Sequence, residues 1–200
     1  MKNDGFLLIF KKALTRKRGE AVAHEILNHE LVRKAADFAK KSHAGQLRKN
    51  GKEYFSHADA VARIVAAWSN EPETVAAAFL HDTLEKCCIT LGDITGEFGP
   101  RVARYVSNLS KRTTAGLAIR FVAYCAALRK APEAVKLIKA ADIVHNASDD
   151  PKKGWFPQAG KMMAAVQSGK LGNYSAGISA LGKEFRRLAA PILDRKSSAS

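Results

Sequence analysis

The spacing of apolar residues from Glu20 towards the carboxyl end is that of α-helices, and it limits the fold more than any other feature of the sequence. Within residues 31–42, for example, Leu31, Ala35 and Ala39 fall on one helical face while most of the charged side chains lie elsewhere. Alternating runs of β-branched and aromatic residues are nearly absent. The sequence therefore predicts an all-α protein.

Size and composition suit one soluble domain. The chain has 200 residues, 46% of them hydrophobic, and it holds no apolar run long enough to cross a bilayer. A short apolar patch near the amino end is cut off by Lys11 and Lys12, which does not fit a secretion signal. Cys87, Cys88 and Cys125 form neither an even disulfide set nor a metal-binding pair, so reduced thiols are expected. We expect a cytoplasmic protein, of an oligomeric state that the sequence leaves open.

The formal net charge of +14 is large for this length and attracts anions, including nucleotides and nucleic acids. A protein that binds nucleic acid specifically is expected to carry a recognition motif, or aromatic residues interleaved with the basic ones, and neither is found here. We interpret most of the positive charge as solvated surface. Specific nucleic-acid binding is therefore not expected.

An apolar helical run in the middle of the chain carries the residues best suited to chemistry. It places His81 next to Asp82, with Glu85 one helical turn after His81, so that metal ligands and a proton-transfer group lie close together. The helix is expected to begin near Pro72 and to reach Glu85 or the residue after it. Consecutive helical residues point about 100° apart, so His81 and Asp82 can share an ion only if other helices supply more ligands.

Two other predicted helices offer such ligands. Ser56 is expected to cap a helix that runs to about Trp68, which places His57 in the first turn. The later helix expected over residues 132–147 contains Asp142. Two imidazoles and two carboxylates suit a divalent ion such as Mn²⁺ or Fe²⁺, with Zn²⁺ as an alternative, and leave positions for water and substrate.

Five segments stand in a fixed order between Leu31 and Asn146: residues 38–46, the Arg-Lys-Asn-Gly turn at 48–51, Tyr54 with His57, residues 76–83, and residues 139–146. Together they resemble the HD-domain phosphohydrolases, and more closely the RelA/SpoT-type hydrolases of the alarmone ppGpp. The resemblance implies an all-helical HD-domain bundle at residues 30–190. It would lie between a basic, helical amino-terminal extension at residues 1–29 and a tail at 191–200 that is expected to be disordered.

The same resemblance assigns roles to individual residues. Those expected to bind one Mn²⁺ ion are His57, His81, Asp82 and Asp142. Those expected to border the nucleotide or face the substrate are Arg48, Lys49 and Asn146. The implied reaction is metal-dependent removal of the 3′-pyrophosphate of a guanosine alarmone, which converts ppGpp into GDP and pyrophosphate.

The chain departs from the family pattern beside the His-Asp pair. Members of the family carry a Glu-Asp pair there that handles the water and its protons, whereas this chain has Glu85 and Lys86. Glu85 keeps the carboxylate that can accept a proton, while Lys86 replaces an acid with a cation that can stabilise a phosphate oxygen. Two alternatives therefore stay open: an HD hydrolase of another phosphorylated nucleotide, and a catalytically weakened HD module that binds a nucleotide.

Overall fold

The computed structural model describes residues 23–111, 121–149, 151, 153–169 and 171–193. Over these residues the regular elements are helices, and the β-structure amounts to one isolated bridge between Leu47 and Glu53. The prediction of an all-α fold is confirmed. None of the described helices is long and apolar enough to cross a membrane.

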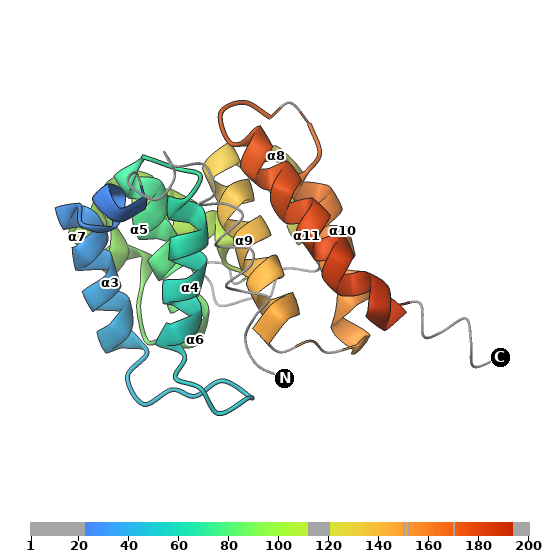
Figure 1. Ribbon diagram of the computed structural model, residues 1–200. Helices are drawn as coiled ribbons and strands as arrows, with labels where there is room; N and C mark the ends of the chain where they lie inside the picture. Colours follow the sequence, from blue (N-terminus) through green and yellow to red (C-terminus); the bar gives the residue numbers. More distant parts are fainter. Residues whose placement is uncertain (1–22, 112–120, 150, 152, 170, 194–200) are drawn as a thin grey trace.

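The described helices form one bundle (Figure 1). From residue 30 onwards the α-helices are, in chain order, α3 (Glu30–Ser42), α4 (Phe55–Ala66), α5 (Pro72–Leu80), α6 (Thr83–Lys86), α7 (Leu91–Leu109), α8 (Phe121–Lys130), α9 (Glu133–Asp149), α10 (Phe156–Val166) and α11 (Ser175–Leu193). Of the expected amino-terminal extension only residues 23–29 are described, and 23–27 are helical. Of the expected tail only residues 191–193 are described, and they belong to α11.

Helix α9 runs through the middle of the molecule, with α4 and α5 on one side and α10 and α11 on the other (Figure 1). It is buried on all sides, as a helix with apolar residues around its whole circumference must be. Helix α5 contributes a run of small side chains, Ala76, Ala77 and Ala78, that lets α3 and α4 pack closely against it. The polar residues of α9 are therefore held in a fixed, largely dry setting.

The helix predicted to run without interruption from Pro72 to about residue 86 is broken, and that prediction was wrong. Helix α5 ends at Leu80, Asp82 has φ −102° and ψ −5°, and α6 begins at Thr83. The Thr83 hydroxyl donates to the Leu80 carbonyl over 2.7 Å, and such a local side-chain bond competes with regular helical pairing. The break lies at the His-Asp pair itself.

The start of α4 also differs from the prediction. Ser56 is not the cap, because its hydroxyl donates back to the Glu53 carbonyl over 2.7 Å, and the residue before the helix is Tyr54. Even so, His57 lies in the first turn of α4, as expected.

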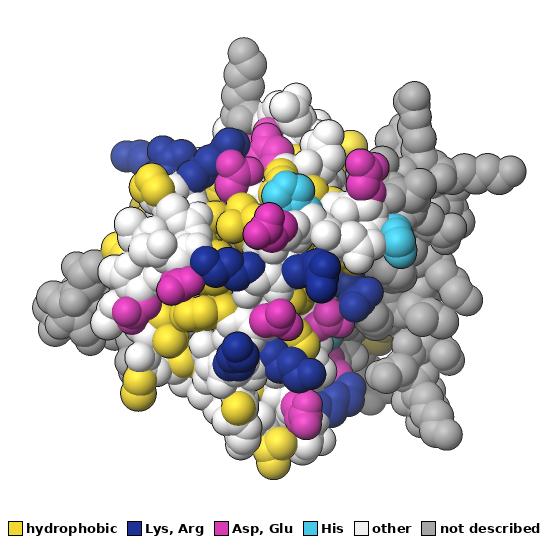
Figure 2. Space-filling view, turned by 90° about the vertical axis from the view of Figure 1, so that its left-hand side faces the viewer, with side chains coloured by type: hydrophobic (Ala, Val, Ile, Leu, Met, Phe, Trp, Pro, Cys, Tyr) yellow, Lys and Arg dark blue, Asp and Glu magenta, His cyan; other side chains and the backbone are white. Residues whose placement is uncertain are grey.

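Figure 2 shows the face that lies on the left of Figure 1, where α3 and α7 run. Basic and acidic side chains are interspersed on this face. Lys34 on α3 and Glu97 on α7 form an ion pair with their charged atoms 2.8 Å apart. A hollow of about 570 Å³ beside this pair is lined by groups of both signs. The positive charge of the chain does not gather into a continuous basic surface here.

Candidate metal centre

His57 is 1% exposed, because α5 and α9 both pack against α4. Its Nδ1 atom lies 2.8 Å from Nδ1 of His145 on α9. Burial lowers the pKa of His57, which keeps the ring neutral at pH 7. A neutral imidazole is the form that binds a metal ion.

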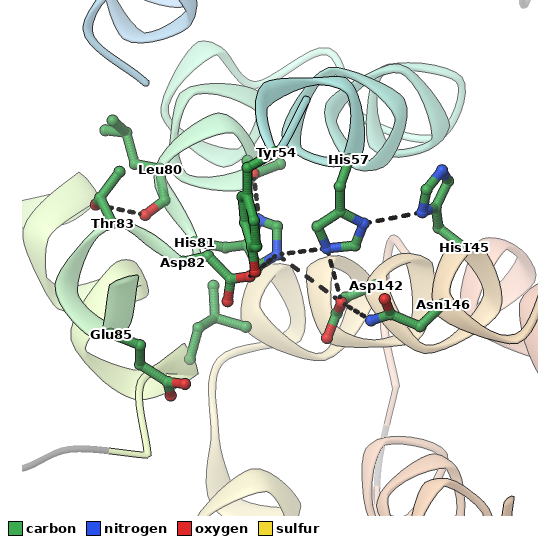
Figure 3. Close-up of polar contacts among 12 residues, drawn as sticks. Tyr54, His57, Leu80, His81, Asp82, Thr83, Glu85, Asp142, His145 and Asn146 are labelled. Atoms are coloured by element: carbon green, nitrogen blue, oxygen red, sulfur yellow. Dashed lines mark hydrogen bonds and ion pairs between the residues drawn. The ribbon is translucent and has the colours of Figure 1, made fainter. Parts of the chain in front are cut away.

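His81 stands where α5 gives way to α6, and it too is buried. Its Nδ1 atom donates to the Ala78 carbonyl over 2.8 Å. Since a carbonyl oxygen only accepts, Nδ1 carries a proton, and in the neutral form of the ring Nε2 would offer a lone pair. Figure 3 shows this Nε2 atom turned towards His57, and the two Nε2 atoms are 3.2 Å apart.

Asp142, on α9, brings a carboxylate to the same place. Its Oδ1 atom lies 3.2 Å from Nε2 of His57 and 3.8 Å from Nε2 of His81, and it accepts a hydrogen bond of 2.6 Å from Asn146. Its Oδ2 atom accepts from the Lys139 ammonium over 2.7 Å. Burial alone would raise the pKa of Asp142, but the Lys139 charge and the contact with His57 bring that pKa well below its usual value. Asp142 is therefore ionised.

Three ligand atoms, one each from His57, His81 and Asp142, lie within 4.8 Å of one another in this buried spot. When both rings are in the neutral form that binds a metal ion and the carboxylate is ionised, at most one of these atoms carries a proton, so at least two acceptors face each other. Such an arrangement is repulsive unless a cation lies among them. Neighbouring ligands with bonds of about 2.1 Å to one ion lie about 3 Å apart, so the residues fit a divalent metal ion.

Asp82, the fourth expected ligand, lies beside this group rather than within it. Its Oδ2 atom is 3.6 Å from Nε2 of His81 and accepts a hydrogen bond from the Tyr54 hydroxyl. The Tyr54 ring is stacked on His43, with the ring centres 4.7 Å apart. Burial raises the pKa of Asp82, but the nearby His81 and His57 rings and the hydrogen bond from Tyr54 together outweigh that effect, and the net shift of the pKa is downward. Asp82 thus offers a charged oxygen at the edge of the cluster.

The two residues expected to handle protons and phosphate lie farther along α6. The Glu85 carboxylate accepts a hydrogen bond from the backbone N–H of Lys111, just after α7. Figure 3 shows Glu85 on the α6 side of the site, outside the hydrogen-bonded group of His57, His81 and Asp142. The Lys86 side chain is exposed. The backbone carbonyl of Lys86 accepts a hydrogen bond of 3.0 Å from the side-chain amide of Gln46.

The basic turn between α3 and α4, which we define as residues 47–53, contacts the carboxyl end of α9 through hydrogen bonds and ion pairs. Arg48 donates to Oδ1 of Asn146 over 2.9 Å, and its Nε atom lies 3.2 Å from Asp149. Asp149 also accepts from the Asn50 amide over 3.0 Å and pairs with Lys52. Lys49, by contrast, is exposed.

A family model described as "HD domain" matches residues 35–152, which is more than half of the chain. This chain belongs to the HD domain family. The match covers the basic turn and every residue of the cluster described above.

Several relatives of this HD domain carry names from alarmone metabolism. The guanosine-3′,5′-bis(diphosphate) 3′-pyrophosphohydrolase of Vibrio cholerae is 41% identical over 93 residues, which are 45% of this chain and 13% of that protein. The GTP pyrophosphokinase rsh of Brucella ovis is 34% identical over 126 residues, which are 60% of this chain and 17% of that protein. The chain thus spans less than a fifth of these relatives.

A solved structure supports the fold of this HD domain. The metazoan ortholog of SpoT, described as hydrolysing ppGpp, superposes with a TM-score of 0.65 at 20% sequence identity, covering 78% of this chain and 96% of that one. At that level of identity the likeness shows the shared fold.

The sequence did not reveal what Lys139, Asp149 and Tyr54 contribute to the site of this HD domain. Lys139 and Asp149 stand three residues before and seven residues after Asp142, so all three lie on one face of α9. That spacing is a signal that could have pointed to them. The contact between Tyr54 and Asp82 depends on the break between α5 and α6, which the sequence pattern hides.

Proposed function

We propose that this HD domain is a Mn²⁺-dependent phosphohydrolase that removes the 3′-pyrophosphate from guanosine 3′,5′-bis(diphosphate) in the cytoplasm. The observation that carries the proposal is the convergence of His57, His81 and Asp142 in a buried cluster that fits a divalent ion. The names of relatives that align with this part of the chain support the choice of substrate.

In the proposed site the ion would be held by four side chains: His57, His81, Asp142 and, from the edge, Asp82. A bound divalent ion supplies Lewis-acid polarisation of a phosphoryl oxygen and of a water molecule. The donor set of imidazole and carboxylate suits Mn²⁺. The hydrogen bonds of His81 to Ala78 and of Asp142 to Lys139 orient these two ligands before substrate arrives.

The remaining proposed roles belong to groups around the cluster. Glu85, steadied by the Lys111 amide, would accept the proton of the attacking water. Lys49, exposed on the basic turn, would meet the negative charge of the nucleotide, and Asn146 and Arg48 form the adjoining wall. The Lys86 side chain is exposed and would act on the substrate through its charge.

The test is incubation of the purified protein with ppGpp and Mn²⁺, with GDP and pyrophosphate separated by ion-exchange chromatography. His81→Ala serves as the matched control, because it removes one ligand without altering the basic turn. Product from the wild-type protein and none from the variant is expected. Absence of any guanine nucleotide product from the wild-type protein would contradict the proposal. A panel of other phosphorylated nucleotides, assayed with Mn²⁺, Mg²⁺, Zn²⁺ or no metal, separates ppGpp hydrolysis from the related alternative.

The presence of a lysine, Lys86, directly after Glu85 favours a second candidate, a nucleotide-binding HD module that carries out little chemistry. It predicts that ppGpp binds with a measurable affinity while turnover is absent. Equilibrium dialysis of ppGpp alongside the hydrolysis assay distinguishes the two functions.

A further inference from the structure

Four side chains form a continuous row of polar contacts from the basic turn to the metal cluster. Asp149 pairs with Arg48 at 3.2 Å, and Arg48 donates to Oδ1 of Asn146 over 2.9 Å. Asn146 then donates to Oδ1 of Asp142 over 2.6 Å, and that same oxygen faces Nε2 of His57 at 3.2 Å. Figure 3 shows the last part of this row, with Asn146 beside Asp142 on α9.

Arg48 is committed to the protein rather than presented to solvent. Its side chain is 9% exposed and that of Asp149 is 8% exposed, so the pair between them is largely dry. The neighbouring Lys49 is exposed, and the Lys52 side chain, which also reaches Asp149, is 44% exposed. The cations of the basic turn therefore divide into one that points inward and others that remain near solvent.

The contact with Arg48 holds one end of the Asn146 amide, and the Asp142 carboxylate holds the other. An amide group has one accepting and one donating end, whereas a guanidinium only donates. Because Arg48 takes the Oδ1 end, the Nδ2 end is turned towards the Asp142 carboxylate, where it donates. The opposite orientation would bring an amide oxygen against a carboxylate oxygen, which is repulsive. Arg48 thus reinforces the orientation in which the Asn146 amide donates to Oδ1 of Asp142.

We propose that Arg48 is a positioning residue of the metal centre, acting on Asp142 through Asn146 while Asp149 holds its guanidinium in place. The inference rests on the metal site of the proposed function, and it separates Arg48 from Lys49, which would act on the substrate. Removing Arg48 takes away the contact on the Oδ1 side of the Asn146 amide, which loosens the amide and so weakens metal binding even when no nucleotide is present. Groups that orient a metal ligand typically change metal affinity by about 10–100-fold when they are removed.

The experiment measures Mn²⁺ binding to the metal-free protein by isothermal titration, with the electron paramagnetic resonance of free Mn²⁺ as a second readout. Arg48→Met, Arg48→Lys and Asp149→Asn are compared with two controls from the same turn, Lys49→Met and Lys52→Met. Circular dichroism checks that each variant remains folded. Arg48→Lys is informative because an ammonium cannot reproduce the two-sided contact of a guanidinium.

We expect Arg48→Met to weaken Mn²⁺ binding by about 10-fold, and Asp149→Asn to weaken it in the same direction. In the double variant that combines Arg48→Met with Asp149→Asn, the two losses of Mn²⁺ affinity should be less than additive, because both residues act through one contact. Arg48→Lys should fall between Arg48→Met and the wild-type protein, and both control variants should stay within about twofold of it.

Unchanged Mn²⁺ affinity in folded Arg48→Met, with only the KM for ppGpp raised, would overturn the inference and make Arg48 a substrate contact. A loss of affinity in Lys52→Met equal to that in Arg48→Met would also overturn it, because general loss of positive charge would then be the cause. Failure of the wild-type protein to hydrolyse ppGpp while it binds Mn²⁺ would refute the proposed function and leave this inference standing. Failure to bind Mn²⁺ would refute both.

Discussion

Nδ1 of His57 and Nδ1 of His145 lie 2.8 Å apart in the core, so a single proton is shared between two buried rings. When His57 carries that proton on Nδ1, its Nε2 lone pair faces His81 and Asp142, as a metal ligand must. His145 then accepts the hydrogen bond and fixes the orientation of the His57 ring.

Replacement of His145 should therefore weaken metal binding although this ring is not one of the expected ligands. His145→Leu removes the acceptor and is expected to lower the Mn²⁺ affinity by about 10–100-fold. His145→Asn keeps an acceptor on a shorter side chain and should recover part of the loss. Isothermal titration of the metal-free proteins measures the effect, and equal affinities for the Leu variant and the wild-type protein would show that His145 serves packing alone.

Stability of the metal-free protein should fall as the pH is lowered from 7 to 5. Burial lowers the pKa of His145 to about 3, and burial also lowers the pKa of His43. The unfolded chain takes up protons at about pH 6.5 while these folded rings stay neutral, so the unfolded state gains stability below that pH. For His145 alone, the free energy of unfolding should fall by about 2 kcal/mol between pH 7 and pH 5. Urea unfolding in the presence of EDTA measures it, and a steeper loss in His145→Leu than in the wild-type protein would contradict this assignment.

Glu85→Gln should separate proton transfer from metal binding. The Gln side chain keeps an oxygen that can accept from the Lys111 amide, so the geometry around α6 is preserved, but it cannot take up a proton. We expect kcat for ppGpp to fall by about 100-fold or more, with Mn²⁺ affinity within about twofold of the wild-type value. A variant with full kcat would remove Glu85 from the proposed chemistry.

Lys86→Asp should raise turnover, because it places an acid beside Glu85 on an exposed position that tolerates substitution. An increase in kcat of about 10-fold is expected, and Lys86→Ala is the matched control that removes the cation without adding the acid. Rates for ppGpp hydrolysis that are the same in all three proteins would mean that position 86 has no part in the reaction.

Lys139→Met should destabilise the metal-free protein, because it leaves the buried Asp142 carboxylate without its cation. Breaking a buried ion pair in this way costs about 3–5 kcal/mol. Added Mn²⁺ should restore part of the loss, since a ligand that binds only the folded state stabilises it. Thermal unfolding with Mn²⁺ and with EDTA checks both statements, and a melting temperature that does not change on substitution would contradict them.

The fold class was accessible from the sequence because helical periodicity is a local property. Residues 31–42 illustrate this, since their apolar spacing alone predicted α3 to within a residue. The structure also brings three of the expected metal ligands, His57, His81 and Asp142, within 4.8 Å of one another; their role as ligands stays a prediction.

The parts that escaped prediction depend on contacts between segments far apart in sequence. Arg48 and Asp149 are separated by about a hundred residues, and nothing local to either indicates that they pair. The interruption after Leu80 was missed for a different reason, since a Thr hydroxyl that bonds backwards to a carbonyl leaves the apolar pattern intact.

The interruption between α5 and α6 separates the proposed metal ligand His81 from the proposed proton-transfer residue Glu85. His81 directly follows a core helix packed on several sides, whereas Glu85 and Lys86 belong to a single turn, in which Glu85 accepts a hydrogen bond from the Lys111 amide. Substitutions within that turn can alter the chemistry without disturbing the cluster of His57, His81 and Asp142. An exchange between lysine and an acid at position 86 should thus have little consequence for folding, so that the rate of the proposed reaction can be changed separately from the capacity to hold an ion.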